Sequence, residues 1–272
     1  MASPSTADIA AIPTNSLDRA IEILDLLRAH PKGLTHAELC RSLGLPSSTC
    51  SYITAKLERR GYLRREPESR RFCLGLKMVS LARGALHGLG FRSIAEPVLH
   101  RLTAETGLSV GIGIAQGAHV LLVDRVEGPE VIGEVVTARK PRVQTREQRE
   151  VGRELPFHTT ALGKVLLANL PPEDLDRLLP KLRLNRRTRT TIHSEQELRR
   201  QLAEVRQQGF ATAHEEHYAS VRALAVPLRD AAGVTRAALS LNGSPDSNAW
   251  SDPAKLVALM KTAAREISKN FY

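Results

Sequence analysis

Cysteine is scarce in this sequence, and long apolar runs are absent. The 272 residues include three cysteines, Cys40, Cys50 and Cys73, which show no C-x-x-C spacing. An odd number of cysteines without metal-ligand spacing indicates unpaired thiols in a reducing compartment, and we interpret them as small buried hydrophobes. No apolar run approaches the roughly 20 residues of a membrane span, and the start MASPSTADIAAIPTNS lacks the basic and apolar segments of a secretory signal. We therefore expect a cytoplasmic protein without a membrane partner.

Acidic residues are outnumbered by basic ones. Lys and Arg total 39 against 29 Asp and Glu, which gives a formal net charge of +10. Some face of the protein should therefore attract phosphate or other anions. The Arg-rich segment at residues 137–153 has little apolar periodicity, and we expect a surface loop that either stays solvated or reaches DNA or a partner. The length suits two domains, each with its own core, after a flexible N-terminus at residues 1–15.

The pattern becomes helical from residue 16. In SLDRAIEILDLLRAHPKG the apolar residues recur every three or four positions until a proline and a glycine end the stripe. Thr35 and Glu38 have the spacing of a capping box that begins a second short helix, which Gly44 ends. A third helix is expected after Pro46, because proline is tolerated in the first helical turn but not in the interior. Three short helices with this tight turn predict a helix-turn-helix.

Short hydroxyl side chains at the start of the third helix predict contact with DNA. They allow close approach to the major groove and hydrogen bonds to phosphates or base edges. Downstream, GYLRREPESRRFCLG predicts a two-stranded basic wing whose arginines bind phosphate. A hydroxyl run can also be only a helix cap, and an Arg-rich hairpin only a solvated surface, but the order of the elements favours DNA binding. The residues expected to contact DNA are Ser47, Ser48, Thr49, Ser51, Tyr52, Lys56, Arg70 and Arg71.

The second half of the chain predicts a sheet and a ligand site. LSVGIGIAQGAHVLLVDRV indicates two strands around a turn, and the spacing of Gly111 and Gly113 is not that of a dinucleotide-binding loop. These glycines instead leave space beside a ligand or a neighbouring element. HTTALGKVLLA predicts a helix capped by Thr159 or Thr160, whose first N–H groups and dipole suit a carboxylate. The alternative is that the Gly-Lys pair in this helix serves only packing and solubility.

No catalytic or metal-binding set is evident. His214 and His217 lie three residues apart in a strand-to-loop segment, whereas a helical zinc motif needs histidines at i and i+4 and a third ligand. No G-x-S-x-G or other nucleophile, histidine and acid set is present. We expect no metal, no cofactor and no enzyme activity. A small-molecule hydrolase in the second domain and a DNA-binding architectural protein without a ligand remain the alternatives.

Several of these motifs resemble one known family. The first half of the chain resembles the winged helix-turn-helix of IclR-type bacterial transcription regulators. The motifs that carry this resemblance are Ser48-Thr49 in the third helix, Gly61-Tyr62 after it and Leu74-Gly75 at the end of the wing. Residues 155–168 are similar to the motif L-P-x-H-x-x-A-x-G-K-x-x-L-A of their effector domain. The resemblance implies an α+β protein with a winged helix-turn-helix at residues 16–77, a linker helix at 78–91, and a GAF-like α/β effector domain with an antiparallel sheet at 92–272.

The resemblance also implies partners. It predicts a homodimer or a dimer of dimers that binds a near-palindromic double-stranded DNA operator and responds to a small carboxylate effector. Tyr52 stands where relatives commonly carry Arg, so the operator sequence does not transfer from them. Ala213 and Ala223 replace an Asp and a Cys of several relatives, which enlarges the pocket and favours an aromatic or other apolar acid. The expected effector-binding residues are Gly111, Ala161, Leu162, Gly163, Ala213, Ala223, Ser240 and Asn242.

Overall fold

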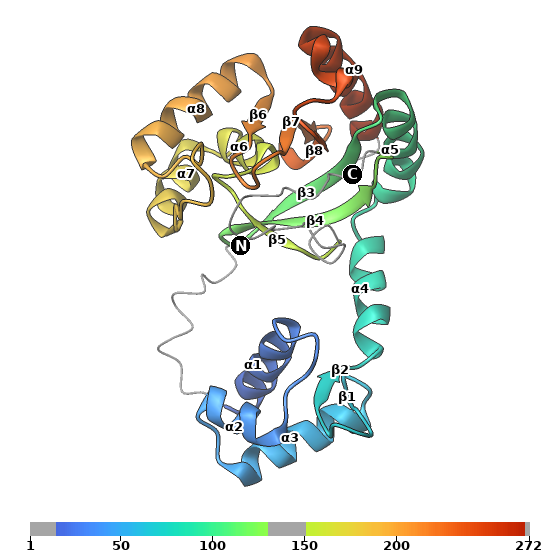
Figure 1. Cartoon of the computed structure of the whole chain (residues 1–272), viewed down its shortest axis with the longest axis vertical. Helices are drawn as coiled ribbons and strands as arrows, with labels where there is room; N and C mark the ends of the chain where they lie inside the picture. Colours follow the sequence, from blue (N-terminus) through green and yellow to red (C-terminus); the bar gives the residue numbers. More distant parts are fainter. Residues whose placement is uncertain (1–14, 130–150, 270–272) are drawn as a thin grey trace. The chain divides into compact units, whose positions relative to one another are not determined.

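Two compact units make up the chain. The computed structural model describes residues 15–129 and 151–269, and the first unit ends at Gly88 while the second begins at Leu89 (Figure 1). The expected flexible terminus, apart from Asn15, and residues 137–150 of the Arg-rich segment lie outside the described residues. In the described ranges, no helix is long and apolar enough to cross a membrane.

The first unit is a winged helix-turn-helix. Asn15 and Asp18 form a capping box at the first helix, and Thr35 and Glu38 form the predicted one at the second. Gly44 ends the second helix with φ 62°, a left-handed conformation that glycine adopts without Cβ strain. The elements are α1 (Ser16–Arg28), α2 (His36–Leu43), α3 (Ser47–Arg59), β1 (Leu63–Arg65) and β2 (Phe72–Leu74), and β1 pairs with β2 as an antiparallel wing. Both the predicted helix-turn-helix and the wing are confirmed.

One small core holds the first unit together. The apolar stripe of α1 packs on α2, on α3 and on the wing, and this burial stabilises helices too short to persist alone. Because these contacts use the inner face of α3, the opposite face stays free of packing. The buried members of this core are Ile23, Leu27, Leu34, Leu39, Cys50, Ile53, Leu63 and Phe72.

Two helices follow the wing, where one linker helix was expected at residues 78–91. Helix α4 spans Lys77–His87, and α5 begins only at Arg92 and spans Arg92–Thr106. Gly90 lies between them with φ 65°, a conformation that lets the chain change direction. The expected linker helix at residues 78–91 therefore corresponds to α4 and the segment after it.

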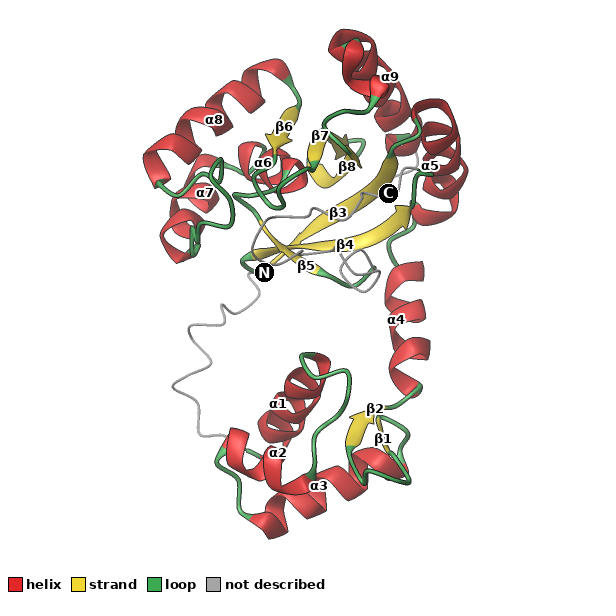
Figure 2. Ribbon diagram, viewed as in Figure 1, coloured by secondary structure: helices red, strands yellow, loops and turns green. Residues whose placement is uncertain are grey.

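An antiparallel sheet forms the centre of the second unit, as predicted. Its strand order is β5-β4-β3-β8-β7-β6, with β3 (Ser109–Gln116), β4 (His119–Val126), β5 (Glu154–Pro156), β6 (Ala211–His214), β7 (Arg222–Arg229) and β8 (Thr235–Gly243). Helices α5 and α9 (Pro253–Ser268) cover one face, and α6 (Ala161–Ala168), α7 (Pro172–Leu178) and α8 (Glu195–Gln208) lie on the other (Figures 1 and 2). Single 3-10 turns occur at Leu179–Lys181 and Asn248–Ser251.

Small side chains on the sheet leave space beneath the start of α6. Ala223 of β7 is flanked by Ala213 of β6 and Asn242 of β8, and in the next row Ser240 of β8 is flanked by Ala225 and Gly111. Alternate residues of a strand share one face, so these rows present methyl groups, a hydroxyl and an amide to the same side. The register of the sheet thereby builds the floor of a cavity.

Candidate functional site

Exposed hydroxyl groups mark the outer face of α3. Ser47, Ser48 and Ser51 are exposed, and Thr49 is half-buried. Pro46 occupies the N-cap position and no side chain caps this helix, so the interpretation of the hydroxyl run as a helix cap is wrong. The Ser51 hydroxyl instead lies 2.9 Å from Nε2 of His36 on α2. These hydroxyl groups are available at the end of the helix that a helix-turn-helix places nearest the bases.

Tyr52 and Lys56 form a pair on the same exposed helix. The ammonium group of Lys56 lies 4.8 Å from the centre of the Tyr52 ring, and Tyr52 is 58% exposed. A hydrogen bond from Lys56 lowers the pKa of the Tyr52 phenol. The pair presents an aromatic edge and a cation side by side, which suits contact with a sugar-phosphate backbone and bases.

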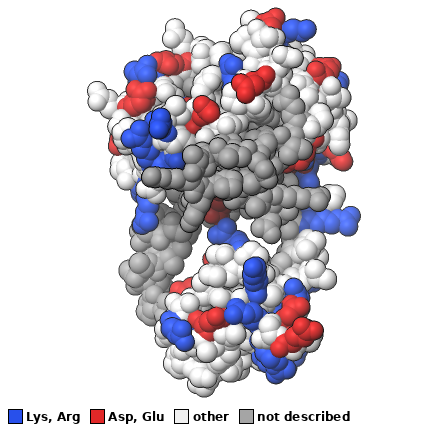
Figure 3. All heavy atoms as spheres, in the orientation of Figure 1, with Lys and Arg blue, Asp and Glu red and all other residues white. Residues whose placement is uncertain are grey.

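The wing arginines differ in their partners. Arg71 donates to the carbonyl oxygen of Gly33 at 2.8 Å and to Glu38 at 3.1 Å, so it ties the wing to α2. Arg70 is exposed, and no carboxylate in the described part of the chain pairs with it. Basic and acidic side chains of the first unit are interspersed on the face in Figure 3 rather than gathered into one patch. Arg70 is therefore freer than Arg71 to meet a phosphate.

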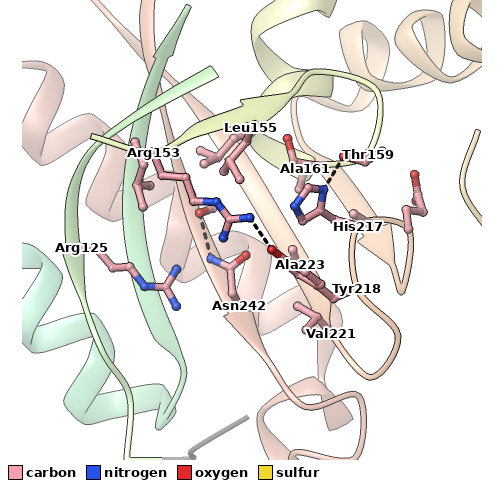
Figure 4. A pocket seen from close by; sticks show the side chains of 16 residues that line it. Arg125, Arg153, Leu155, Thr159, Ala161, His217, Tyr218, Val221, Ala223 and Asn242 are labelled. Carbon is pink, nitrogen blue, oxygen red and sulfur yellow. Dashed lines mark hydrogen bonds between the residues drawn. The ribbon is translucent and has the colours of Figure 1, made fainter. Parts of the chain in front are cut away.

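A cavity lies between the start of α6 and the sheet (Figure 4). About 80 Å³ of it is open to the centre of a water molecule, several times the roughly 10–15 Å³ that one water needs, so it can hold a small organic molecule. Six of the eight expected effector-binding residues line it: Ala161, Leu162, Ala213, Ala223, Ser240 and Asn242.

The other two expected residues, Gly111 and Gly163, lie outside the lining. A Cβ on Gly163 would lie 2.1 Å from the carbonyl oxygen of Phe157, so the close approach of two backbones requires glycine there. Its N–H also donates to the Thr160 hydroxyl at 3.0 Å, which confirms Thr160 as the cap of α6. Gly163 thus serves packing, as the alternative interpretation held. The N–H groups of Ala161 and Leu162, in the first turn, have no intrahelical acceptor.

Two arginines that the sequence did not single out give the cavity a basic wall. Arg153 donates a hydrogen bond to the Tyr218 hydroxyl, and its guanidinium lies 5.6 Å from the centre of that ring (Figure 4). Arg125 is largely buried, with 11% of its side chain exposed, and pairs with Glu127 at 2.6 Å. Within residues 15–129 and 151–269, no carboxylate lies within salt-bridge distance of Arg153. Glu216, a carboxylate in the lining, pairs with Lys164, so the unpaired charge of Arg153 favours an anionic ligand.

A neutral histidine also lines the cavity. Nδ1 of His217 lies 2.7 Å from the Thr159 hydroxyl, while the buried Nε2 has no partner among the described groups. Burial, with Arg187 and Arg153 nearby, lowers the pKa of His217 to about 3. His217 therefore lines the cavity as an uncharged imidazole near neutral pH. His214 is exposed on β6 and does not converge with His217 on a third ligand within the described residues.

These residues were missed because no local pattern marks them. Arg153 and Tyr218 are 65 residues apart, and Thr159 and His217 are 58 apart. Arg153 lies at the end of the Arg-rich segment, where its charge looked like solvated surface. One feature of the sequence could have indicated these residues: polar residues flank the motif at residues 155–168 along the chain, and they lie beside the same cavity.

Two domain families of known proteins match the sequences of the two units. Residues 16–67 match the IclR helix-turn-helix domain, and residues 83–269 match the C-terminal domain of the bacterial transcriptional regulator IclR. The transcriptional regulator XynR of Escherichia coli K12 is 31% identical over 84% of this chain and 85% of its own length. The regulator BhcR of Paracoccus denitrificans is 31% identical over 93% of this chain and 86% of its own. The relatives are regulators rather than enzymes.

Solved structures agree with the sequence comparisons. An IclR regulator from Alicyclobacillus acidocaldarius is 26% identical with a TM-score of 0.78, over 96% of this chain and 100% of that one. An IclR homologue from Microbacterium hydrocarbonoxydans, in complex with 4-hydroxybenzoate, is 25% identical with a TM-score of 0.78, over 94% and 99%. The winged helix-turn-helix, the antiparallel sheet and both family matches lead to one conclusion: this chain belongs to the IclR family of bacterial transcriptional regulators and is a DNA-binding regulator.

Proposed function

We propose that the effector of this regulator is a small aromatic or other apolar carboxylic acid, bound in the cavity beside α6. The observation that carries the proposal is Arg153, a cation in the cavity wall without a carboxylate partner in the described ranges. The first-turn N–H groups of Ala161 and Leu162 add a partial positive charge. A carboxylate is the anion class that both groups recognise through charge-assisted hydrogen bonds.

The floor of the cavity determines which acids fit. Ala213 and Ala223 present methyl groups, and Leu122 and Leu155 add apolar surface. These side chains stabilise a flat apolar body and leave the hydroxyl groups of a small sugar-like acid without partners. A polar substituent at the far end of the ligand is expected near Ser240 and Asn242. The complex of a relative with 4-hydroxybenzoate supports an acid of this shape.

The first unit carries the DNA contacts in this proposal. Helix α3 enters the major groove with Ser47, Ser48, Thr49 and Ser51 near the bases, and Arg70 of the wing contacts phosphate. The protein acts as a homodimer or a dimer of dimers on a near-palindromic operator, with half-sites about one helical turn or a multiple apart. An effector that favours one arrangement of the two copies shifts the distance between their α3 helices and so the affinity for DNA.

Fluorescence anisotropy tests the regulator and its ligand class together. Labelled DNA from upstream of the gene is compared with random DNA at two salt concentrations, with aliphatic and aromatic acids added in turn. We expect salt-sensitive binding that prefers the upstream DNA and changes with one class of aromatic acid. Equal weak binding to both DNAs, or tight binding of pyruvate with no response to benzoate-like acids, would contradict the proposal.

A variant pair isolates the role of the Arg153 charge. Arg153→Gln should weaken binding of a benzoate-like acid in calorimetry by about tenfold or more, because one charge-assisted hydrogen bond contributes roughly 1.5–3 kcal/mol. Binding of the matching neutral amide should change far less. Arg189→Gln, an exposed position in the same unit, removes the same charge away from the cavity. If the two variants bind the acid equally well, Arg153 is not the anchor.

A further inference from the structure

Three metal-binding side chains meet in the first unit, away from the cavity. His36 and Cys40 lie four residues apart on α2, so they share one face of that helix, and Cys50 faces them from α3. Their ligand atoms all lie within 4.8 Å of one another. The set escaped the sequence patterns because its third member comes from a different helix, ten residues beyond Cys40.

One distance in the cluster already suits a tetrahedral ion, and the others come within about 1 Å of the required range. Nδ1 of His36 lies 3.7 Å from Sγ of Cys40. With Zn–S near 2.3 Å and Zn–N near 2.0–2.1 Å, neighbouring ligand atoms of a tetrahedral zinc site are roughly 3.5–3.8 Å apart. The widest separation in the cluster exceeds this by about 1 Å, which side-chain rotation can close because His36 and Cys40 are only half-buried. Three protein ligands leave the fourth position for water.

The second nitrogen of His36 already has the partner that a metal-binding histidine needs. Nε2 of His36 lies 2.9 Å from the hydroxyl of Ser51. A histidine that binds a metal through one nitrogen commonly donates its other N–H to a neighbouring oxygen, which fixes the tautomer and the ring orientation. Here that oxygen belongs to the outer face of α3, so the cluster is joined directly to a residue expected to contact DNA.

The burial of Cys50 disfavours a bare thiolate. Cys50 is fully buried in the core of the first unit, so packing fixes the position of its sulfur beside His36 and Cys40. A thiolate in such surroundings requires a cation in contact with the sulfur. A thiophilic d10 ion supplies this, and each thiol releases its proton when the ion binds.

We propose that the helix-turn-helix binds one Zn²⁺ ion through Nδ1 of His36 and the sulfur atoms of Cys40 and Cys50. The bound ion fixes the His36 ring, which holds the Ser51 hydroxyl in one orientation on the DNA-facing side of α3. Zinc then acts as a second input to this regulator, separate from the effector cavity. It raises the affinity for the operator by ordering a contact residue before DNA arrives.

Metal binding is tested first, on the reduced full-length protein. Cd²⁺ titration is followed by the thiolate-to-cadmium charge-transfer band, and Zn²⁺ affinity is measured by competition with a chromophoric chelator. We expect one ion per chain in the wild type and in Cys73→Ser, a matched control because Cys73 is also buried but lies in the wing. His36→Gln and Cys40→Ser, at half-buried positions, should lose at least tenfold in affinity. Equal affinity in all four proteins, or no charge-transfer band, would overturn the site.

The expected effect of Zn²⁺ on DNA binding is tested in a separate experiment. Anisotropy on upstream DNA is compared with Zn²⁺ and with chelator, in the wild type and in Ser51→Ala. We expect Zn²⁺ to strengthen upstream DNA binding several-fold in the wild type, and Ser51→Ala to bind the ion normally but lose this response. Ion binding without any effect on the wild-type DNA affinity would overturn the regulatory role. Because neither arm adds an acid, its outcome is independent of the effector proposal.

Discussion

Nζ of Lys164 lies 2.7 Å from Oε1 of Glu216, and both side chains are almost completely buried, at 1% and 8% exposure. Lys164 also donates to Gln201 and to the carbonyl oxygen of Thr212, so its three N–H donors are satisfied. Burial lowers the pKa of Lys164 and raises that of Glu216, and the attraction between them opposes both shifts. The pair joins α6 to the segment after β6 at the edge of the cavity.

Removing one partner of this pair should destabilise the second unit strongly. Lys164→Met leaves the Glu216 carboxylate buried without its counter-ion, a change that typically costs about 3–5 kcal/mol. The double variant Lys164→Met with Glu216→Gln should recover much of this loss, because no charge then remains buried. Urea unfolding midpoints measure the stability of the single variant and of the double variant. A double variant less stable than either single one would show that the pair is not the source of the stability.

The neutral state of His217 should make the second unit acid-sensitive. Its pKa is about 3 in the folded protein and near 6.5 when unfolded. Between these values the unfolded chain binds a proton that the folded chain does not, so stability falls as pH drops from about 6.5 to 3. The slope from this group is at most about 1.4 kcal/mol per pH unit. His217→Gln should flatten the curve of unfolding free energy against pH in this window, whereas His119→Gln, at an exposed position, serves as the control. Parallel curves for all three proteins would refute the assignment.

Glycine is required at position 163 by packing alone. Gly163→Ala would place a Cβ 2.1 Å from the Phe157 carbonyl oxygen and 2.4 Å from its Cα. Backbone atoms cannot rotate away, so we expect a loss of about 3 kcal/mol or more. Gly84→Ala, in α4, meets no atom within 4 Å and should be neutral or up to about 1 kcal/mol stabilising through helix propensity. Thermal unfolding of both variants measures the contrast, and a stable Gly163→Ala protein would contradict the packing argument.

The hydroxyl run of α3 should contribute to sequence readout. Ser48→Ala combined with Thr49→Ala removes two hydroxyl groups that we expect near the bases, without changing charge, so we expect a larger loss on upstream DNA than on random DNA. The loss should be about 1–3 kcal/mol if a base contact is broken. Competition anisotropy with both DNAs measures it, and equal losses on the two would assign these hydroxyl groups to phosphate contacts.

Variants of the two wing arginines should both weaken DNA binding, but only one of them should also lower stability. Arg70→Gln should weaken binding to upstream and random DNA alike and lower the salt slope by about one, while the urea midpoint stays constant. Arg71→Gln should also lower the urea midpoint, because Arg71 bridges to Glu38 and Gly33. Anisotropy at a series of salt concentrations measures the DNA affinity of each variant, and urea unfolding measures its stability. Identical behaviour of the two variants in both assays would refute the division of roles.

Local elements could be predicted because their signals are local. The capping box at Thr35 and Glu38 and the left-handed Gly44 lie within ten residues of one another, so periodicity and capping locate α2 without tertiary information. The capping box at Asn15 was overlooked because the preceding residues suggested an unstructured terminus. For the cavity, the family motif around Ala161 indicated the correct helix. The arginines of the cavity wall have no local sequence pattern that would indicate them.

By itself the sequence determined the winged helix-turn-helix and the helix after Thr160, because these follow from periodicity and caps. Its short motifs also carried the family resemblance, which implied the antiparallel sheet. The tertiary structure alone decided which side chains meet. It buried Lys164 against Glu216, 52 residues away, aligned Arg153 with Tyr218, and brought Cys50 to His36 and Cys40. The physical reason is that desolvation and close contact depend on segments distant along the chain, whose approach is set by the packing of the core.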